Sequence, residues 1–581
     1  MRHFSNDFQH AHLSRGLAAI ATLACAAIAM AQAPTASEQD AKPAPRDRYL
    51  FKIAPQGDKK PDATPDPAAP PAPPTSGRIV LFFVPDTARW AGESPVEGPF
   101  FQKLQPIASV AVPAATDGAI ITLDDSNATT FGGPLDLLDG AWRVQAVLDT
   151  DFTERGHVGP GDILSEPVRI ELSPDRADEI RIELVHRVEA TKPPATPGVE
   201  WIERKSALLS KHFRRDMNMR AGVVLPFGYD DLSYPRRMWP TIYVISGFGG
   251  NHLDAASAAA ALRSPDARVA IPQAVWVFLD AETAWGHHGF CDSETNGPVG
   301  KALVEEFVPF LEERFRLISK PEARVVTGHS SGGWTSVHLA LSYPATFGAC
   351  FASSPDPVDF SAFQRTDIYR EASLFIGGDG SETPSYRGPL GPNEDRVFMT
   401  VRDEVGSEYA IDPNGRGGEQ WAAWDAMWSP YDPAHAAPRR LCDPTSGAID
   451  PVTVEAWSRH DIAKLFEREP ARVADLFATR IRLVCGTRDS YYLNEAVARL
   501  KGKLEAWRTA ARARGDKPAD GPGYIELLDG LTHDTAYSAA QLRFHRGIVE
   551  HFRANGLADP IPGMKPDPRP APSAGTAKPP R

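Results

Sequence analysis

The chain has 581 residues, of which 42% are hydrophobic, so it can bury a large core and form more than one domain. Acidic residues outnumber basic residues by 75 to 62, which gives a formal net charge of -13. This excess of negative charge disfavours a nucleic-acid-binding surface and is typical of a soluble protein with neutral or cationic partners.

The N-terminus is predicted to be an export signal that covers residues 1–31. Positive charge at Arg15 precedes the apolar run Leu17–Ala31, which is too short to cross a bilayer comfortably. The sequence Ala-Met-Ala at 29–31 has the form of a signal-peptidase site. We therefore expect an exported protein, periplasmic or secreted, with no membrane span in its mature chain. A buried or membrane-anchoring helix is the alternative, and a lipid-modified Cys25 is a weaker one.

Of the five cysteines, Cys25 lies in the predicted signal. An oxidising compartment would permit disulfides among the others, Cys291, Cys350, Cys442 and Cys485, but the sequence does not reveal their pairing. Cys350 and Cys485 lie in apolar runs, where buried free thiols are the alternative. Because no cysteine or histidine cluster has the spacing of a zinc site, we expect no structural metal.

Two segments rich in proline and alanine, 32–76 and 557–581, lack apolar periodicity and are predicted to be a disordered linker and a disordered tail. Residues 77–189 contain short β-rich runs separated by Gly, Pro and Asp, with no plausible helix among them. This pattern predicts an antiparallel β-sandwich as an N-terminal domain. The predicted strands are Ile79–Val84, Ala119–Leu123, Trp142–Leu148, Val168–Leu172 and Ile180–Val185.

Residues 200–556 show a different pattern, in which strands alternate with helices. Alternation of this kind predicts a mostly parallel sheet with helices on both faces. From Leu303 to Leu311 the apolar residues recur at helical spacing. Residues 378–461 are rich in Pro, Gly, Asp and Trp and are interpreted as an insertion between core strands. The first predicted strands are Met219–Leu225, Thr241–Ile245, Ala274–Leu279 and Ala323–Thr327.

The clearest chemical motif is Gly-His-Ser-Ser-Gly-Gly at 328–333, which matches G-x-S-x-G. A predicted strand ends at Thr327 and a predicted helix begins near Gly332. A sharp strand-to-helix turn exposes the serine hydroxyl, and the flanking glycines allow a strained backbone and close packing. Ser330 is therefore the candidate nucleophile. Ser331 is the rival hydroxyl, although the register of the motif favours Ser330.

A serine hydroxyl needs a base to accept its proton, and in the α/β-hydrolase fold the acid and the base follow the serine along the chain. Asp489 follows the apolar strand 481–486, and His533 follows the short strand 524–528. The carboxyl ends of such strands carry the active site of an open α/β sheet, so Asp489 is the predicted acid and His533 the predicted base. The weaker candidates are His435, His460 and His545 as base, and Asp356, Asp359 and Asp461 as acid; Asp534 is interpreted as a loop or helix-cap residue.

An oxyanion hole needs two backbone N–H donors. One is predicted to be that of Ser331. The other should come from the glycine-rich turn 246–250, which follows the predicted strand Thr241–Ile245. Phe248 is the predicted donor and Gly249 the alternative, while an ordinary strand-to-helix turn is the non-functional interpretation.

From about Arg214 to Phe552 the sequence resembles the Putative esterase family of the α/β-hydrolase superfamily, which includes esterase D, enterochelin-esterase-like proteins and feruloyl esterases. The resemblance implies that carboxylic esters are hydrolysed through an acyl-enzyme without a cofactor. It also implies that the N-terminal domain is an accessory domain. The residues that carry the resemblance are Ser246–Gly250, Gly328–Gly333, Ser342–Pro344 with Phe347, Gly486–Asp489, Gly530–His533, and Phe290–Ser293 with Asn296–Gly297.

The sequence departs from the family in two places. Ser246 stands where the family usually has histidine before the glycine. The gap between Ser330 and Asp489 is longer than usual because of the insertion, which carries the aromatic residues Trp421, Trp424, Trp428 and Tyr431. These aromatic side chains either line a substrate cleft, for a sugar or aryl group, or form a small satellite core.

The sequence thus predicts an exported serine esterase whose substrate is a small-molecule or glycan-linked ester. An exported peptidase of the same fold and a non-catalytic binding protein are the alternatives. The absence of a propeller-like repeat disfavours the peptidase, and an intact Ser, Asp and His set disfavours the binding protein. Neither the substrate nor the oligomeric state follows from the sequence.

Overall fold

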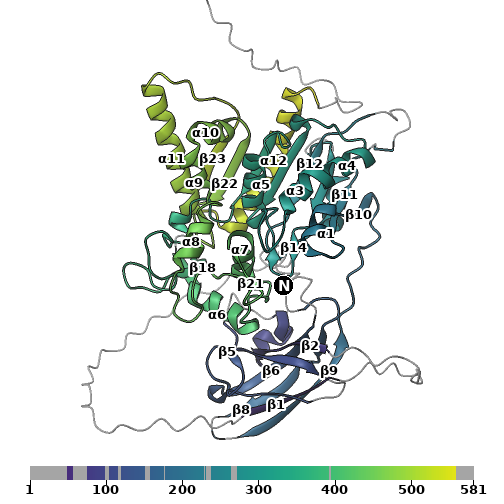
Figure 1. The fold of residues 1–581 in the computed structure, drawn as a ribbon, viewed down its shortest axis with the longest axis vertical. Helices are drawn as coiled ribbons and strands as arrows, with labels where there is room; N and C mark the ends of the chain where they lie inside the picture. The colour runs from purple at the N-terminus through teal and green to yellow at the C-terminus, as the bar shows by residue number, and fades with distance from the viewer. Residues whose placement is uncertain are drawn as a thin grey trace, which may run out of the picture.

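The computed structural model describes residues 49–55, 75–97, 104–115, 120–150 and 158–557, apart from 174, 176, 228, 231–236, 264–270 and 392–393. The predicted export signal, most of the predicted linker and the tail from residue 558 lie outside these residues. The described residues form an N-terminal β domain and a larger domain in which a sheet lies between helices (Figure 1). No helix in the described part of the chain is both long and apolar enough to cross a membrane.

The N-terminal domain is a nine-stranded sheet in the order β4-β1-β9-β7-β6-β2-β3-β5, with β8 paired to β6. Phe51 of β1 packs edge to face on Phe83 of β2, with ring centroids 5.8 Å apart, although three strands separate β1 from β2 in this order. The sheet therefore curls on itself around an apolar core, as a sandwich does. Its strands are β1 (Tyr49–Pro55), β2 (Thr75–Pro85), β3 (Ile107–Ala115), β4 (Ile121–Leu123), β5 (Thr129–Phe131), β6 (Gly140–Asp149), β7 (Ile163–Ser165), β8 (Val168–Leu172) and β9 (Asp178–Arg187).

The predicted linker 32–76 is wrong over part of its length. Strand β1 lies inside it and pairs in parallel with β9, and β2 begins at Thr75. The side chains of Tyr49, Phe51 and Ile53 are buried in the core of the domain. Strand β1 was not predicted because its short alternating pattern lies between proline-rich segments. The predicted antiparallel pattern therefore has one parallel exception.

The larger domain contains an eight-stranded sheet in the order β10-β11-β13-β12-β16-β17-β22-β23. From β13 to β23 all neighbours are parallel, while β10 and β11 pair antiparallel. All five side chains of β13 and of β17 are buried, as expected for strands covered on both faces. The strands are β10 (Val199–Lys205), β11 (Asn218–Val224), β12 (Thr241–Ile245), β13 (Val275–Leu279), β16 (Arg324–His329), β17 (Ala349–Ser353), β22 (Ile481–Gly486) and β23 (Tyr524–Leu528).

Helices cover both faces of this sheet (Figure 1). The helical segment predicted from Leu303 onwards is confirmed; it contains a π-helical turn at Leu303–Phe307 between α3 and α4. The helices are α1 (Ala207–Phe213), α2 (Asp254–Leu262), α3 (Val299–Ala302), α4 (Val308–Arg314), α5 (Ser331–Ser342), α9 (Ile462–Arg468), α10 (Pro470–Thr479), α11 (Leu493–Ala513) and α12 (His533–Ala554). A small hairpin, β14 (Glu282–Thr283) and β15 (Gly286–His287), follows β13.

The predicted insertion falls between β17 and β22. It contains the hairpin β18 (Pro384–Gly391) and β19 (Glu394–Thr400). Three helices follow: α6 (Val401–Ile411), α7 (Gln420–Trp428) and α8 (Pro451–Trp457), with the short pair β20 (Tyr431–Asp432) and β21 (Ala437–Pro438) between them. Figure 1 shows α6 and α7 between the core sheet and the N-terminal domain.

Helix α6 packs directly on the N-terminal domain. Ala410 and Ile411 share an apolar cluster with Val80, Phe82 and other side chains of that domain. Beside this cluster Arg78 pairs with Asp412 at 3.4 Å, with 9% and 4% of the two side chains exposed. The N-terminal domain is therefore attached to the insertion through a buried contact.

Candidate active site

Ser330 occupies the turn between β16 and α5 and has the strained backbone angles φ 57 and ψ -126. A left-handed φ is costly for any residue that carries a Cβ, and such strain is concentrated at functional sites. The turn projects the serine from the carboxyl end of a central strand. Ser331 is the first residue of α5, one residue before the predicted start of the helix.

The glycines around Ser330 are required by close backbone packing. A Cβ on Gly328 would lie 2.2 Å from the Gly332 oxygen, and a Cβ on Gly332 would lie 2.0 Å from the Ile245 oxygen. Both distances are far below any van der Waals contact, so a larger residue at either position would push α5 away from the sheet. The motif therefore has the geometric basis that its sequence predicts.

The structure brings the predicted acid and base together. Nδ1 of His533 lies 2.8 Å from Oδ2 of Asp489, and both side chains are buried. Oδ1 of the same carboxylate accepts the backbone N–H groups of Tyr491 and Leu493. These bonds fix the orientation of the carboxylate, and the carboxylate in turn fixes the imidazole. His533 is the first residue of α12 rather than part of the preceding loop, and Thr532 caps this helix.

The charges of this pair stabilise each other. Burial raises the pKa of Asp489, but His533 and the two backbone N–H groups lower it more, so the pKa lies below its usual value. Burial lowers the pKa of His533, but Asp489 outweighs burial and the pKa lies above its usual value. An imidazolium formed during a reaction would therefore be stabilised.

Two aromatic rings pack against His533. The ring of His329, the residue before Ser330, lies 4.3 Å from the His533 ring between centroids, which brings the start of α12 next to the nucleophile turn. Burial lowers the pKa of His329 well below its usual value, so this ring stays neutral. Tyr491 packs edge-on against His533 at 4.9 Å. Tyr491 was not among the residues predicted from the sequence, although its position two residues after Asp489 is a usable signal.

The predicted oxyanion loop passes beside Ser330, the candidate nucleophile. A Cβ on Gly247 would lie 3.3 Å from the Ser330 Cβ. Phe248 and Gly249 follow directly, and Gly249 has a left-handed φ of 92°. Nε2 of His287 lies 3.2 Å from the Ser246 oxygen, so a histidine from β15 contacts the position at which the family usually has one.

Asp356 is a buried carboxylate next to the nucleophile turn. Its Oδ2 accepts hydrogen bonds from the Ser331 hydroxyl and from the Trp424 indole N–H, each at 2.8 Å. Burial raises the pKa of Asp356 to about 6, and these two bonds oppose the rise. From the sequence, Asp356 was predicted only as a weaker candidate for the acid of the triad. Its position just after β17, at the carboxyl edge of the sheet, was the available signal for a site residue.

The β18–β19 hairpin braces the loop that carries Asp489. The Nε of Arg387 donates to the Asp489 carbonyl at 3.0 Å, and its backbone N–H donates to the Ser490 carbonyl at 2.9 Å. Arg387 and Arg488 both pair with Asp395 on β19. The insertion therefore helps to hold the loop of Asp489 in place.

The competing residues have other roles. His435 is exposed and pairs with Asp432, His460 contacts the Cys291 thiol at 3.3 Å, and His545 packs against Trp276. Asp359 pairs with Lys503, and Asp461 caps α9. The cysteines of the described chain, Cys291, Cys350, Cys442 and Cys485, are free and buried.

The tryptophans of α7 belong to the main core of the domain. Trp421, Trp424 and Trp428 are buried and share one apolar cluster with the side chains of the central sheet. They are therefore neither an open substrate cleft nor a separate satellite core. Tyr431 is 36% exposed.

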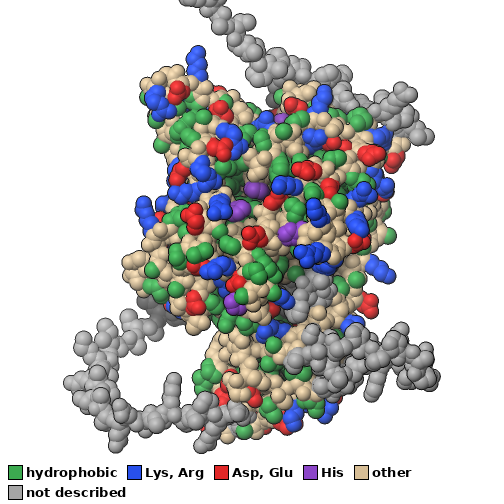
Figure 2. Space-filling model, in the orientation of Figure 1, with side chains coloured by type: hydrophobic (Ala, Val, Ile, Leu, Met, Phe, Trp, Pro, Cys, Tyr) green, Lys and Arg blue, Asp and Glu red, His purple; other side chains and the backbone are tan. Residues whose placement is uncertain are grey.

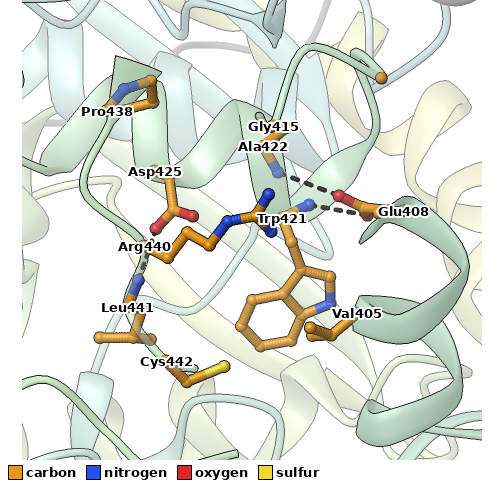
Figure 3. Close-up of a pocket in the computed structure, with 11 residues that line it drawn as sticks. Val405, Glu408, Gly415, Trp421, Ala422, Asp425, Pro438, Arg440, Leu441 and Cys442 are labelled. Atoms are coloured by element: carbon orange, nitrogen blue, oxygen red, sulfur yellow. Dashed lines mark hydrogen bonds between the residues drawn. The ribbon is translucent and has the colours of Figure 1, made fainter. Parts of the chain in front are cut away.

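A small cavity lies beside α7, with a volume of about 20 Å³, which is room for a single water molecule (Figure 3). Glu408 of α6 accepts the backbone N–H groups of Trp421 and Ala422 at its edge, and thereby caps the start of α7. Asp425 and Arg440 lie near each other in the wall of the cavity (Figure 3). This cavity lies within the insertion and has none of the candidate catalytic residues in its wall.

The family model described as Putative esterase matches residues 210–541, which is more than half of the chain. The chain belongs to the Putative esterase family. The larger domain has the α/β-hydrolase fold that the sequence predicts, and membership of this family indicates an esterase.

The comparisons with individual proteins are distant. A stretch of 135 residues is 27% identical to the uncharacterized protein YbbA of Bacillus subtilis (strain 168) and covers 22% of this chain and 46% of YbbA, so the match spans less than half of that relative. Among solved structures, a ferulic acid esterase is similar at 14% identity over 61% of this chain and 100% of its own, with a TM-score of 0.35. An S-formylglutathione hydrolase from Agrobacterium tumefaciens is similar at 14% identity over 62% and 98%, with a TM-score of 0.30.

The surface of the enzyme carries charges of both signs. On the face in Figure 2, lysine and arginine side chains are interspersed with aspartate and glutamate, and neither sign forms a large patch. This face therefore lacks the basic stripe that a nucleic-acid-binding protein presents.

Proposed function

We propose that the chain is an exported serine esterase that cleaves carboxylic esters through a triad of Ser330, His533 and Asp489. The observation that carries the proposal is the buried bond of 2.8 Å between His533 and Asp489, combined with a strained serine turn whose neighbour His329 packs on the same imidazole. A base oriented by a buried carboxylate, next to a serine hydroxyl, is the arrangement that activates a serine.

In the proposed reaction Nε2 of His533 accepts the proton of the Ser330 hydroxyl while the oxygen attacks the ester carbonyl carbon. The N–H groups of Ser331 and Phe248 stabilise the resulting oxyanion. The tetrahedral intermediate collapses, the carbon–oxygen bond to the alcohol breaks, and His533 donates its proton to the departing alcohol. A water molecule then hydrolyses the acyl-enzyme by the same route, with His533 again as base.

The proposed substrate is a small-molecule or glycan-linked ester, processed without a metal or cofactor. The half-buried ring of Tyr491 contacts His533, and Tyr386 lies 5.1 Å from Tyr491 between ring centroids. Rings in this position offer a flat apolar surface for an aryl or sugar group. Membership of the esterase family is what favours esters over peptides as substrates. The fold and these ring contacts are compatible with either class.

A fluorophosphonate probe tests the nucleophile, because it reacts covalently with activated serines. We expect labelling of the wild-type enzyme and of Ser331→Ala, but none of Ser330→Ala. p-Nitrophenyl esters assayed in parallel with peptide p-nitroanilides should be cleaved at least a hundredfold faster. Labelling of Ser330→Ala would show that another serine is the nucleophile, and faster cleavage of the anilides would favour a peptidase.

The proposal of export rests on the apolar run Leu17–Ala31 and the small residues at 29 and 31. We expect the mature protein recovered from the periplasm or medium to begin at Gln32, as measured by intact mass. A cytoplasmic protein that retains the apolar run would contradict export without affecting the proposed triad.

A further inference from the structure

Helix α7 of the insertion is connected to the first predicted oxyanion donor through one carboxylate oxygen. The indole N–H of Trp424 and the hydroxyl of Ser331 both donate to Oδ2 of Asp356, each at 2.8 Å. All three side chains are buried, with exposures of 2%, 1% and 3% for Trp424, Ser331 and Asp356. Ser331 is the first residue of α5, and its backbone N–H is the predicted donor. The hydrogen bond from its side chain to Asp356 therefore fixes the position of this N–H group.

The same helix is packed against the loop that carries the second predicted donor. Gly286 of β15 lies between α7 and this loop. A Cβ on Gly286 would lie 3.0 Å from the Ala423 Cβ on α7 and 3.0 Å from Cε2 of Phe248 in the loop. The neighbouring His287 contacts the Ser246 oxygen at the start of the loop. Helix α7 is therefore linked, through Asp356 and through Gly286, to both segments that carry the predicted oxyanion donors.

Oxyanion donors stabilise a transition state only when they are already aimed at the position that the charged oxygen will occupy. A site of this kind depends on supporting residues that hold its inner residues in place. Asp356 supplies such support, since its own backbone N–H donates to the Ser330 carbonyl at 3.3 Å. Removal of the Trp424 donor would leave a buried carboxylate with less hydrogen bonding and would allow Ser331 to shift.

We propose that Asp356 and Trp424 are positioning residues of the oxyanion hole, through which the insertion helix controls transition-state stabilisation. The inference rests on the proposed function. It assigns to the tryptophan-rich insertion a role in the rate of the reaction, in place of a role in binding substrate. Apolar packing of the Trp424 ring is not sufficient for this role, because the role depends on the indole N–H that bonds to Asp356.

The test compares Trp424→Phe with Trp428→Phe in the full-length chain. Both tryptophans are on α7, 2% exposed and stacked in one cluster, but the Trp428 indole N–H lacks a hydrogen-bond partner within the described residues. We expect Trp424→Phe to lower kcat on p-nitrophenyl acetate about tenfold with KM within about twofold of wild type, since the loss concerns only the transition state. The affinity for a trifluoromethyl ketone, which forms a tetrahedral adduct, should fall by the same factor. Trp428→Phe should leave both quantities unchanged.

A second pair of variants covers the case in which loss of an aromatic ring impairs folding. Ser331→Ala removes the other donor to Asp356, while Ser336→Ala removes a buried hydroxyl on the same helix that bonds only within α5. We expect a several-fold loss of kcat for Ser331→Ala and none for Ser336→Ala. The double variant of Ser331 and Trp424 should lose less than the product of the single losses, because both act through Asp356.

Equal kcat values for Trp424→Phe and Trp428→Phe, or for Ser331→Ala and Ser336→Ala, would overturn the inference in an enzyme whose Ser330 is labelled by the fluorophosphonate. Absence of labelling in the wild-type chain would instead overturn the proposed function, and this inference with it. The two failures are thus distinguished by a single labelling experiment on the same preparations.

Discussion

At the residue scale, the ionisation of His533 sets the pH range in which Ser330 can be activated under the proposed mechanism. Only the neutral imidazole accepts a proton, so activity rises as the pH passes the pKa of His533. Burial lowers this pKa and Asp489 raises it, and the net shift is upwards. The acidic limb of the pH–rate profile should therefore lie above the usual range for histidine.

We predict that Asp489→Asn moves this limb to lower pH and lowers kcat by roughly a thousandfold or more. The amide no longer stabilises the imidazolium, and it cannot hold the tautomer that accepts the serine proton. A profile of kcat/KM against pH on a p-nitrophenyl ester measures both effects. Asp534→Asn is the matched control: this neighbouring charge also raises the pKa of His533, but less than Asp489 does. It should shift the limb slightly at nearly full rate, and an equal loss of rate in both variants would refute the assignment of the acid.

At the element scale, α7 is held at both ends by buried carboxylates. Glu408 caps its start, and near its end Oδ1 of Asp425 accepts the backbone N–H of Leu441 at 2.9 Å. Burial raises the pKa of Asp425 to about 7, and Arg440 only partly offsets the rise. The unfolded chain releases this proton near pH 4 and the folded chain near pH 7. Within that window the unfolded state binds fewer protons, so the contribution of Asp425 to stability declines as the pH rises.

We predict that Asp425→Asn removes this decline. Relative to wild type, the variant should gain about 3 kcal/mol of unfolding free energy between pH 4 and pH 7, measured by urea denaturation across the window. Asp450→Asn provides a control of opposite sign in the same insertion. The pKa of Asp450 is lowered, because Arg439 and the start of α8 outweigh burial. Its replacement should therefore cost stability at pH 7 and less as the pH falls, and parallel curves for the two variants would contradict the assignment.

At the scale of the whole molecule, the N-terminal domain and the insertion share an apolar contact and a nearly buried ion pair. Arg78 also donates to the Ser109 hydroxyl at 3.0 Å, so its charge is fixed on the domain side of the contact. Loss of one member of a buried pair leaves the other charge without compensation, which typically costs about 3 kcal/mol or more. The two domains should therefore unfold together in the wild-type chain.

We predict that Arg78→Met, which keeps the aliphatic stem, destabilises the contact by about 3 kcal/mol and separates the unfolding of the two domains into two calorimetric transitions. Arg402→Met is the control, since Arg402 of α6 pairs with Glu382 where both side chains are more than 40% exposed. An exposed pair contributes less than about 1 kcal/mol, and a single transition should remain. One shared transition in both variants would mean that the ion pair does not couple the domains.

The sequence by itself determined the alternation of strands and helices in the larger domain, the position of Ser330 and the residue types of the candidate triad, although strands β10 and β17 were not predicted. Local signals suffice for these features: apolar runs define buried strands, glycines define the tight turn, and the carboxyl ends of strands define where loops with functional residues begin. Strand β1 was not predicted, because its short pattern of alternating apolar and polar residues lies between proline-rich segments. Its partner β9 is also far away in the sequence.

Only the tertiary structure decided how the insertion is used. The aromatic composition of α7 left its role open between a cleft and a satellite core, because the periodicity of one helix does not tell which distant surface it faces. Packing decided that the rings enter the main core and that Trp424 reaches Asp356, a contact between residues 68 positions apart. Likewise, the contact between α6 and the N-terminal domain depends on two surfaces, and neither surface carries a signal for the other in the sequence.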